Sequence, residues 1–289
     1  MSPTYYDKYS TDFVNWFSNI LEKKKQVILY GPPGTGKTYF AKHYCKSIKK
    51  PYGIVQFHPT YEYSDFVQGW VPNADENEGT DDGAPFKFTK KKKIFCKLID
   101  HARTFRKEKY YLIIDEINRG NLGKIFGELI TGLDDRNYEI ILLSGDKITI
   151  PDNLYIIGTM NSADRSVGVI DKALRRRFHF IFFPPSSRLL ERALKGIEIT
   201  NISTEDKDNY IRAVIDLFRK INYHLLSTGN DVNMLIGHTY FIQEGWEELT
   251  DELELTIFPL IEELFPRRKE MLTDLYEELK EWDCSEKIL

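Results

Sequence analysis

The fold of this chain follows from the stretch Gly31-Pro32-Pro33-Gly34-Thr35-Gly36-Lys37-Thr38, which matches the pattern G-x-x-x-x-G-K-S/T of a phosphate-binding loop. Residues 27–30 before it form an apolar run typical of a buried strand, and residues 39–44 after it start a helix. The glycines let backbone N–H groups turn toward phosphate oxygens, and the helix N-terminus adds a positive partial charge. The Lys37 ammonium would then reach the β- and γ-phosphates, and the Thr38 hydroxyl would bind Mg²⁺. The alternative, a surface turn that matches by chance, is disfavoured by the flanking strand and helix.

Composition places the chain among ordinary globular proteins. It has 289 residues, of which 42% are hydrophobic and 29% are charged, so one large or two modest domains are expected. The formal net charge of −4 gives no overall basic surface, so a DNA contact would need a local patch or another chain. Cys45, Cys96 and Cys284 lack the spacing of metal ligands, which together with a nucleotide site favours a reducing, cytoplasmic location. No apolar run approaches about 18 residues, so we expect no membrane contact.

Apolar runs alternate with helical patterns through the first two thirds of the chain. Five of these runs predict the strands of a parallel sheet in an α/β domain, at residues 27–30, 54–57, 110–114, 154–159 and 178–183. An apolar stripe over residues 122–134 predicts one core-facing helix. Residues 140–150 predict a hairpin around Ser144-Gly145-Asp146.

After Pro185 the pattern becomes helical. An apolar stripe covers residues 206–226. Residues 246–280 are acidic and helical in pattern, with interruptions near Pro259 and Pro266. The expected organisation is therefore an α/β domain over residues 1–184 and a smaller, all-helical domain over residues 185–289.

A lysine run, Lys90-Lys91-Lys92-Lys93, follows an acidic, glycine-containing stretch at residues 73–83 that predicts a surface loop. The lysines could contact nucleic acid or form a solvated face. The solvated face is favoured because four lysines fall short of the longer basic tracts that mark nucleic-acid patches.

Two carboxylates, Asp115 and Glu116, directly follow the apolar run at residues 110–114. Parallel strands present their carboxyl ends at one edge of a sheet, and ligands bind there. Asp115 would hold Mg²⁺ directly or through water, and Glu116 would polarise the attacking water. The alternative is a simple strand-end cap, which the pairing with a phosphate-binding loop disfavours.

Polar and basic groups follow the later strands. Asn161, just after residues 154–159, could orient a water or contact the γ-phosphate, or it could be an ordinary turn residue. Arg175, Arg176 and Arg177 are adjacent, and three adjacent arginines cannot all be buried. One could act as an arginine finger in a neighbouring subunit, worth about 10³ to 10⁵ in rate, or the group could form a solvated patch or an ion pair. The residues alone leave both questions open.

Three longer blocks read Ile-Asp-Glu-Ile-Asn-Arg-Gly-Asn at 114–121, Ile-Gly-Thr-Met-Asn-Ser-Ala-Asp-Arg-Ser at 157–166 and Asp-Lys-Ala-Leu-Arg-Arg-Arg-Phe at 171–178. The order of the features described above resembles that of an AAA+ domain, and these blocks resemble the McrB family, the GTPase subunits of modification-dependent restriction systems. Further similar blocks lie at 57–59, 63–66 and 236–241, so the resemblance covers nearly the whole chain. Ser162 stands where the family usually has threonine, and it retains the hydroxyl group.

The resemblance implies roles for individual residues. Asn161 would sense the γ-phosphate, and Asp164 and Arg165 would act at or across the subunit boundary. Arg176 is the preferred arginine finger, with Arg177 second. The nucleotide-binding set would comprise Gly31, Pro32, Pro33, Gly34, Thr35, Gly36, Lys37, Thr38, Tyr39 and His238, with Thr38 and Asp115 as the Mg²⁺ ligands.

The resemblance also implies an AAA+ core followed by a helical lid, with GTP and Mg²⁺ bound between them in a hexameric ring. Asn118 and Arg119 are further candidates for the boundary between subunits. The partner would be a McrC-type endonuclease subunit that stimulates hydrolysis and cuts DNA. Family members carry an N-terminal domain for modified DNA, whereas only about 26 residues precede the first predicted strand here. DNA would therefore be reached indirectly or through a domain absent from this chain.

Two other functions are consistent with the same residues. One is an ATPase of the MoxR or dynein-like branch that remodels a protein partner, and the other is a scaffold that binds nucleotide without turning it over. The sequence has no Asn-Lys-x-Asp motif for guanine recognition. The expectation that the nucleotide is GTP therefore comes from the resemblance, and ATP is the alternative nucleotide.

Overall fold

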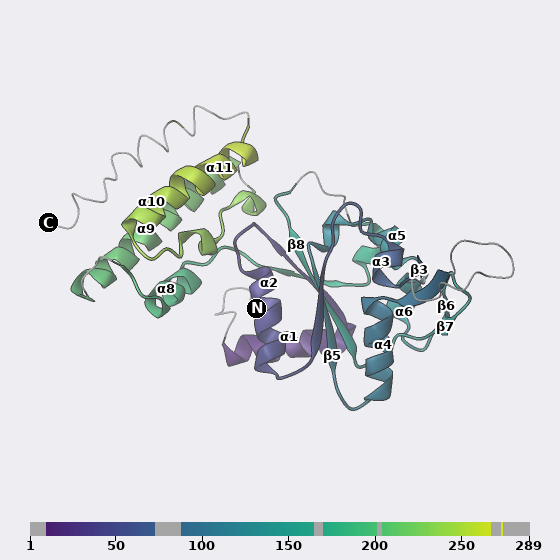
Figure 1. The fold of residues 1–289 in the computed structure, drawn as a ribbon. Helices are drawn as coiled ribbons and strands as arrows, with labels where there is room; N and C mark the ends of the chain where they lie inside the picture. Colours follow the sequence, from purple (N-terminus) through teal and green to yellow (C-terminus); the bar gives the residue numbers. More distant parts are fainter. Residues whose placement is uncertain are drawn as a thin grey trace.

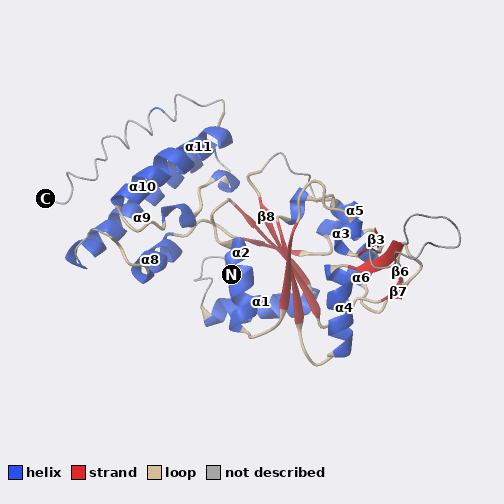
Figure 2. Ribbon diagram, in the orientation of Figure 1, coloured by secondary structure: helices blue, strands red, loops and turns tan. Residues whose placement is uncertain are grey.

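The protein is described by a computed structural model covering residues 10–72, 88–164, 170–200, 204–229, 231–266 and 273. A five-stranded sheet lies at its centre, in the order β2-β5-β8-β1-β9, with every neighbouring pair parallel (Figure 2). The strands are β1 (Gln26–Gly31), β2 (Tyr52–Gln56), β5 (Tyr110–Asp115), β8 (Leu154–Asn161) and β9 (His179–Phe182). This confirms the predicted α/β fold with its parallel five-stranded sheet.

Helices cover both faces of the sheet because the central strands are apolar on both sides. In β1, Val27 and Leu29 join a core with α1 (Thr11–Lys24) and α2 (Lys37–Ser47), whereas Ile28 joins the core on the opposite face. The opposite face is covered by α4 (Ile94–Thr104), α5 (Leu122–Phe126) and α6 (Leu129–Asp134). Every strand therefore delivers its carboxyl end to one edge of a rigid, two-sided core (Figure 1).

The prediction of one helix over residues 122–134 was wrong, because the helix is interrupted between α5 and α6. Gly127 adopts φ +49°, a left-handed conformation that an α-helix cannot contain. Residues on both sides of the break, including Phe126 and Leu129, are buried in the same core. The helical spacing of apolar residues thus continues across the interruption, and Gly127 is the residue in the sequence that indicates it.

Two small hairpins lie at the end of the molecule away from the C-terminal helices (Figure 1). The pair β6 (Ile140–Ile141) and β7 (Lys147–Ile148) confirms the predicted hairpin. The pair β3 (Gln68–Pro72) and β4 (Phe88–Lys92) was not predicted, and it takes up most of the lysine run. A one-turn helix, α3 (Tyr63–Phe66), precedes β3. The predicted loop at residues 73–83 lies outside the described residues.

The C-terminal part is helical, as predicted, and has its own apolar core. It contains α8 (Ser187–Gly196), α9 (Thr204–Gly229), α10 (Trp246–Glu252) and α11 (Phe258–Leu264). A π-helical turn, Leu253–Ile257, precedes α11 and ends two residues before Pro259, near where the sequence predicted a break. We refer to residues 186–266 as the lid, and their separate core supports the proposed division near residue 184. Among the described residues, no helix combines the length and apolar character needed to cross a bilayer.

Candidate functional site

The phosphate-binding loop joins β1 to α2, which begins at Lys37. Gly31 adopts φ +151°, and a Cβ there would lie 2.4 Å from the Phe183 carbonyl oxygen. Gly34 and Gly36 adopt φ +70° and +77°, which residues with a Cβ rarely do. The glycines of the motif are therefore required by the backbone path that the loop takes between strand and helix.

Lys37 is buried inside the loop. Its ammonium donates hydrogen bonds to the Gly31 and Pro32 carbonyl oxygens, at 3.0 and 2.7 Å. Burial lowers the pKa of Lys37 to about 8, and the nearby Glu116 and Asp115 carboxylates partly oppose that shift. The loop thus holds a single cation beside its own backbone, where a polyphosphate would bind.

Oxygen atoms gather where Thr38 meets the end of β5. The Thr38 hydroxyl donates to Asp115 Oδ1 at 2.6 Å, and the Thr159 hydroxyl donates to the same oxygen. Hydroxyl and carboxylate oxygens are the ligands that Mg²⁺ prefers, so Thr38 and Asp115 fit the predicted metal role. Thr159 was not predicted as a site residue, and the available signal was its hydroxyl inside the largely apolar strand β8.

Glu116 lies one residue beyond β5 and adopts φ +51°. Asn161 donates its amide N–H to Glu116 Oε1 at 2.6 Å, and Arg119 donates to Oε2 at 3.3 Å. Burial raises the pKa of Glu116, Asp115 raises it further, and the Arg119 and Lys37 cations lower it. The residues alone are consistent with a turn asparagine at position 161, but in the structure the Asn161 amide lies against Glu116.

Asp164 extends this network. Its carboxylate lies 3.4 Å from Arg119 Nη2, so Arg119 bridges Glu116 and Asp164. A hollow of about 410 Å³ lies between these side chains and the lid, and its lining includes Pro33, Asn161 and Asp164. Arg165, predicted to act at the subunit boundary, lies outside the described residues.

The lid contacts the phosphate-binding loop through backbone hydrogen bonds. Gly237 N donates to Pro33 O, and Thr239 N donates to Gly34 O, each at 3.0 Å. His238, predicted to bind nucleotide, lies between these two contacts and is buried. Tyr39, predicted for the same role, lies near the start of α2. It is 64% exposed and stacks on the His43 ring.

The three adjacent arginines lie at the opposite edge of the sheet, because β9 begins there and runs parallel to β1. Arg177 is 7% exposed, and its guanidinium forms an ion pair with Asp134 at 3.0 Å and donates to two backbone carbonyls of its own chain. Arg175 packs over the Phe180 ring at 4.5 Å. Arg176 is exposed, as is Arg175, whereas Arg177 is buried.

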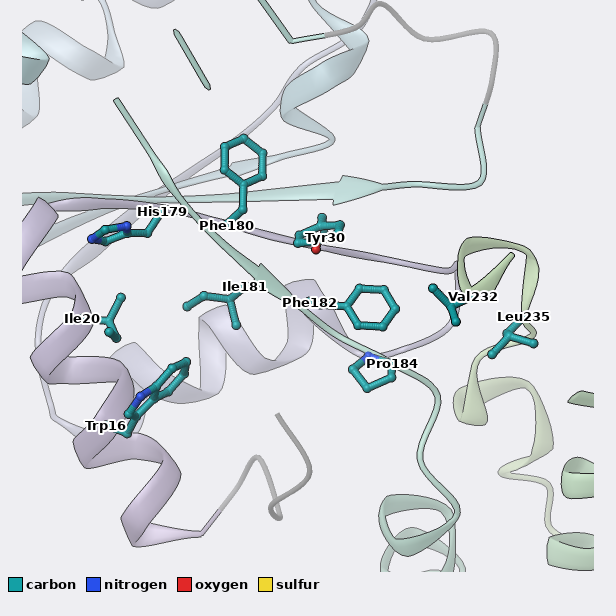
Figure 3. A pocket seen from close by; sticks show the side chains of 10 residues that line it. All are labelled: Trp16, Ile20, Tyr30, His179, Phe180, Ile181, Phe182, Pro184, Val232 and Leu235. Atoms are coloured by element: carbon teal, nitrogen blue, oxygen red, sulfur yellow. The ribbon is translucent and has the colours of Figure 1, made fainter. Parts of the chain in front are cut away.

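A larger hollow of about 520 Å³ runs along β9, the edge strand of the sheet (Figure 3). Trp16 and Ile20 of α1, Tyr30 and Phe182 of the sheet and Leu235 of the lid line it, and its labelled side chains are mostly apolar. The described residues that line this hollow carry no carboxylate, and their polar groups are the Tyr30 hydroxyl, the His179 imidazole and the Trp16 indole. The polar chemistry of the chain therefore lies at the smaller hollow next to the phosphate-binding loop.

Comparison with known proteins agrees with this arrangement. The AAA domain family of the dynein-related subfamily matches residues 26–178. The Type IV methyl-directed restriction enzyme EcoKMcrB subunit of Escherichia coli (strain K12) is 33% identical over 266 residues, covering 84% of this chain and 54% of that protein. The chain thus spans about half the length of that relative. The Type II restriction enzyme BsuMI component YdiS of Bacillus subtilis (strain 168) is 26% identical over 265 residues, covering 79% of this chain and 76% of that protein.

Among solved structures, a mutant of Thermotoga maritima RuvB aligns with a TM-score of 0.43 at 16% identity, over 86% of this chain and 70% of that chain. The family match covers the strands and loops that hold Lys37, Asp115, Glu116 and Asn161. The chain therefore belongs to the dynein-related subfamily of AAA domain proteins and is McrB-like in sequence.

Proposed function

We propose that this chain is the GTP-hydrolysing AAA+ subunit of a McrB-like, modification-dependent DNA restriction complex, acting in the cytoplasm. An AAA domain with an intact phosphate-binding loop binds and hydrolyses nucleotide, and this chain has that domain. The observation that carries the proposal is the hydrogen-bonded pair of Glu116 and Asn161, at 2.6 Å, beside the Asp115–Thr38 contact. This arrangement can hold a water between a base and a bound γ-phosphate.

Each residue has a definite task in this mechanism. Lys37 and the backbone N–H groups of its loop bind the β- and γ-phosphates, and Asn161 orients Glu116. Glu116, with its pKa raised by burial, accepts a proton from the attacking water. Thr38 and Asp115 would hold Mg²⁺, which would supply positive charge against the negative charge that develops on the phosphate oxygens. The lid, through its contacts with Pro33 and Gly34, limits the access of bulk water to the loop.

We further propose that the site is completed by a neighbouring copy in a ring, which we expect to be hexameric. Arg176 is exposed at the sheet edge opposite its own phosphate-binding loop, so any phosphate it reaches belongs to another chain. Asp164 and Arg119 lie on the loop side and would face that neighbour. A positioned arginine of this kind contributes about 10³ to 10⁵ in rate.

The partner in this proposal is a McrC-type endonuclease subunit, whose cleavage of DNA is driven by nucleotide hydrolysis. DNA is reached through that subunit or through a domain outside this chain. The E. coli and B. subtilis relatives, both named as parts of restriction enzymes, support the assignment.

The test is DNA cleavage by the endonuclease subunit together with this chain, comparing methylated with unmethylated DNA and GTP with ATP. The proposal expects cleavage of modified DNA that requires GTP and this chain together. In a matched reaction, the Glu116→Gln variant should bind nucleotide but should not support DNA cleavage. Hydrolysis that prefers ATP, with no cleavage in any combination, would instead support the MoxR-like or dynein-like chaperone.

A further inference from the structure

Gln26, the first residue of β1, places a polar side chain in the core. It is 1% exposed and lies on the same side of the strand as Ile28, which shares a core with α5 and α6. A buried carboxamide is costly unless its polar atoms all find partners, so an apolar residue would be the simpler choice at this position. The contacts of Gln26 therefore indicate what the side chain does there.

The carboxamide of Gln26 joins three segments that are far apart in the sequence. Its amide group donates to the Leu133 carbonyl oxygen at 2.9 Å and to the Arg177 carbonyl oxygen at 2.7 Å. Its oxygen accepts from Arg136 Nη2 at 2.6 Å. Leu133 lies in the last turn of α6, and Arg177 lies between α7 (Lys172–Arg175) and β9. Both donors and the acceptor are thus engaged, and a fully satisfied buried network of this kind makes its surroundings rigid.

The turn that Gln26 holds is the one that carries Arg176. The Arg177 side chain donates to the Ile130 carbonyl oxygen at 2.8 Å and pairs with Asp134, while its backbone carbonyl accepts from Gln26. Arg177 is therefore fixed at its side chain and at its main chain. Arg176 precedes it directly, so the exposed Arg176 side chain starts from a fixed point of the backbone. This lowers the entropy lost when a long side chain is held on a ligand.

The strand β1 carries Gln26 at one end and the phosphate-binding loop at the other. It is six residues long and lies between β8 and β9 in the sheet. Its last residue, Gly31, begins the loop and accepts a hydrogen bond from Lys37. A single buried strand thus sets the position of the loop relative to the arginine turn. In a ring of copies these two parts face opposite neighbours, so their relative position decides whether both shared sites are complete.

We propose that Gln26 is a positioning residue for hydrolysis, which holds the turn before β9 so that Arg176 reaches the phosphates bound by a neighbouring copy. The inference rests on the proposed function, because it requires a site shared between copies. It adds a core residue, at the end of β1 away from the phosphate-binding loop, on which hydrolysis in the neighbour depends. The alternative is that Gln26 only satisfies buried carbonyl groups and stabilises its own chain.

The test mixes two full chains that are inactive alone and measures hydrolysis of the nucleotide that the unsubstituted chain prefers. The donor carries Glu116→Gln and keeps Arg176, whereas the recipient carries Arg176→Ala and keeps its own hydrolytic groups. Gln26→Met is then added to one of the two chains. In the donor it should lower hydrolysis about ten- to a hundredfold, because a displacement of about 1 Å is enough for such a loss. In the recipient, which supplies no arginine, it should change the rate less than about twofold.

The comparison between donor and recipient separates positioning from stability, because a loss of stability acts in whichever chain carries the substitution. Asn153→Leu is the matched control, since the Asn153 amide likewise donates to backbone carbonyls, of Ala102 at 2.9 Å and Glu108 at 2.6 Å, away from the arginine turn. Its effects in donor and recipient should be equal. Gln26→Glu is a second variant, which keeps the volume and the contact with Arg136 but removes both donors. It should reproduce the loss in the donor even where Gln26→Met folds poorly.

The remaining outcomes distinguish this inference from the proposed function. If donor and recipient without a change at Gln26 show no hydrolysis together, the site shared between copies is wrong and the inference fails with it. If they complement each other, and both Gln26 variants lower hydrolysis equally in either chain or in neither, the inference is overturned and the proposed function stands. If the unsubstituted chain hydrolyses no nucleotide, the proposed function itself is wrong.

Discussion

Glu116 has a left-handed backbone conformation and a partly buried carboxylate whose pKa is raised. A left-handed φ costs a residue other than glycine on the order of 1–3 kcal/mol, and such strain collects at functional sites. That conformation turns the chain back toward β8, where Asn161 meets the Glu116 carboxylate. Burial then raises its pKa, which makes the carboxylate a better base than an exposed glutamate.

We predict that Glu116→Gln lowers the rate constant of hydrolysis about 10²- to 10⁴-fold while nucleotide affinity changes little. The amide keeps the size and the contact with Asn161 but cannot accept the proton. Glu108→Gln is the control, since Glu108 forms an exposed ion pair with Lys50 away from the site. Steady-state rates and binding of a non-hydrolysable analogue measure the two effects. An unchanged rate would remove Glu116 from the mechanism.

Lys37 gives a prediction about pH. Its pKa in the free chain is about 8, so the ammonium is charged at pH 7 and loses its proton as the pH rises through 8. Polyphosphate binds the charged form, so nucleotide affinity should fall above pH 8, by at most about tenfold per pH unit. Lys37→Arg keeps its charge and should not show this fall. Identical pH profiles for the two chains would contradict the assignment.

The lid and the phosphate-binding loop act as one element, because Gly237 packs directly on Gly34. A Cβ on Gly237 would lie 1.9 Å from the Gly34 carbonyl carbon, so the lid or the loop must move. We predict that Gly237→Ala weakens nucleotide binding at least about tenfold, since a displaced loop no longer holds its N–H groups toward the phosphates. The control is Gly196→Ala, where an added Cβ meets no atom within 4 Å. Equal affinities of the two variants, measured with a fluorescent nucleotide, would count against lid contact as a binding element.

Arg177 fixes the turn between α7 (Lys172–Arg175) and β9, and so presents Arg176. Arg177→Gln leaves the Asp134 carboxylate and two backbone carbonyls without their donor. We predict a loss of about 1–3 kcal/mol in the free energy of unfolding, measured in urea. Arg175→Gln, which removes only a contact with the Phe180 ring, should cost less than about 1 kcal/mol. The reverse order of effects would show that Arg177 is not the structural member of the group.

The strands and the two carboxylates at the end of β5 could be predicted from the sequence because both leave local patterns. Continuous apolar runs identify buried parallel strands, and Asp115 and Glu116 directly follow one of them. Contacts between distant segments leave no such pattern: Gly237 and Pro33 meet only in the folded chain. Three adjacent arginines also look alike in sequence, and only packing shows that Arg177 is buried.

At the scale of the whole molecule, the sheet separates the two groups that the proposed ring would bring together in one site. Lys37 and Asp115 lie at the carboxyl ends of the strands, whereas Arg176 precedes the amino end of β9. One chain cannot bring these edges together without breaking its core, but copies arranged head to tail can. Hydrolysis per chain should therefore rise with protein concentration, which steady-state rates over a dilution series will measure. A rate per chain that stays constant from dilute to concentrated protein would contradict a site shared between copies.

The most direct measurement mixes two inactive variants, Glu116→Gln and Arg176→Ala, and follows GTP hydrolysis. The first has an intact Arg176, and the second has an intact site that lacks only its neighbour's arginine. The account predicts that the mixture hydrolyses GTP well above the sum of the two variants alone, because one chain completes the other's site. A mixture no more active than that sum would show that Arg176 does not act between copies, and it would contradict the central claim.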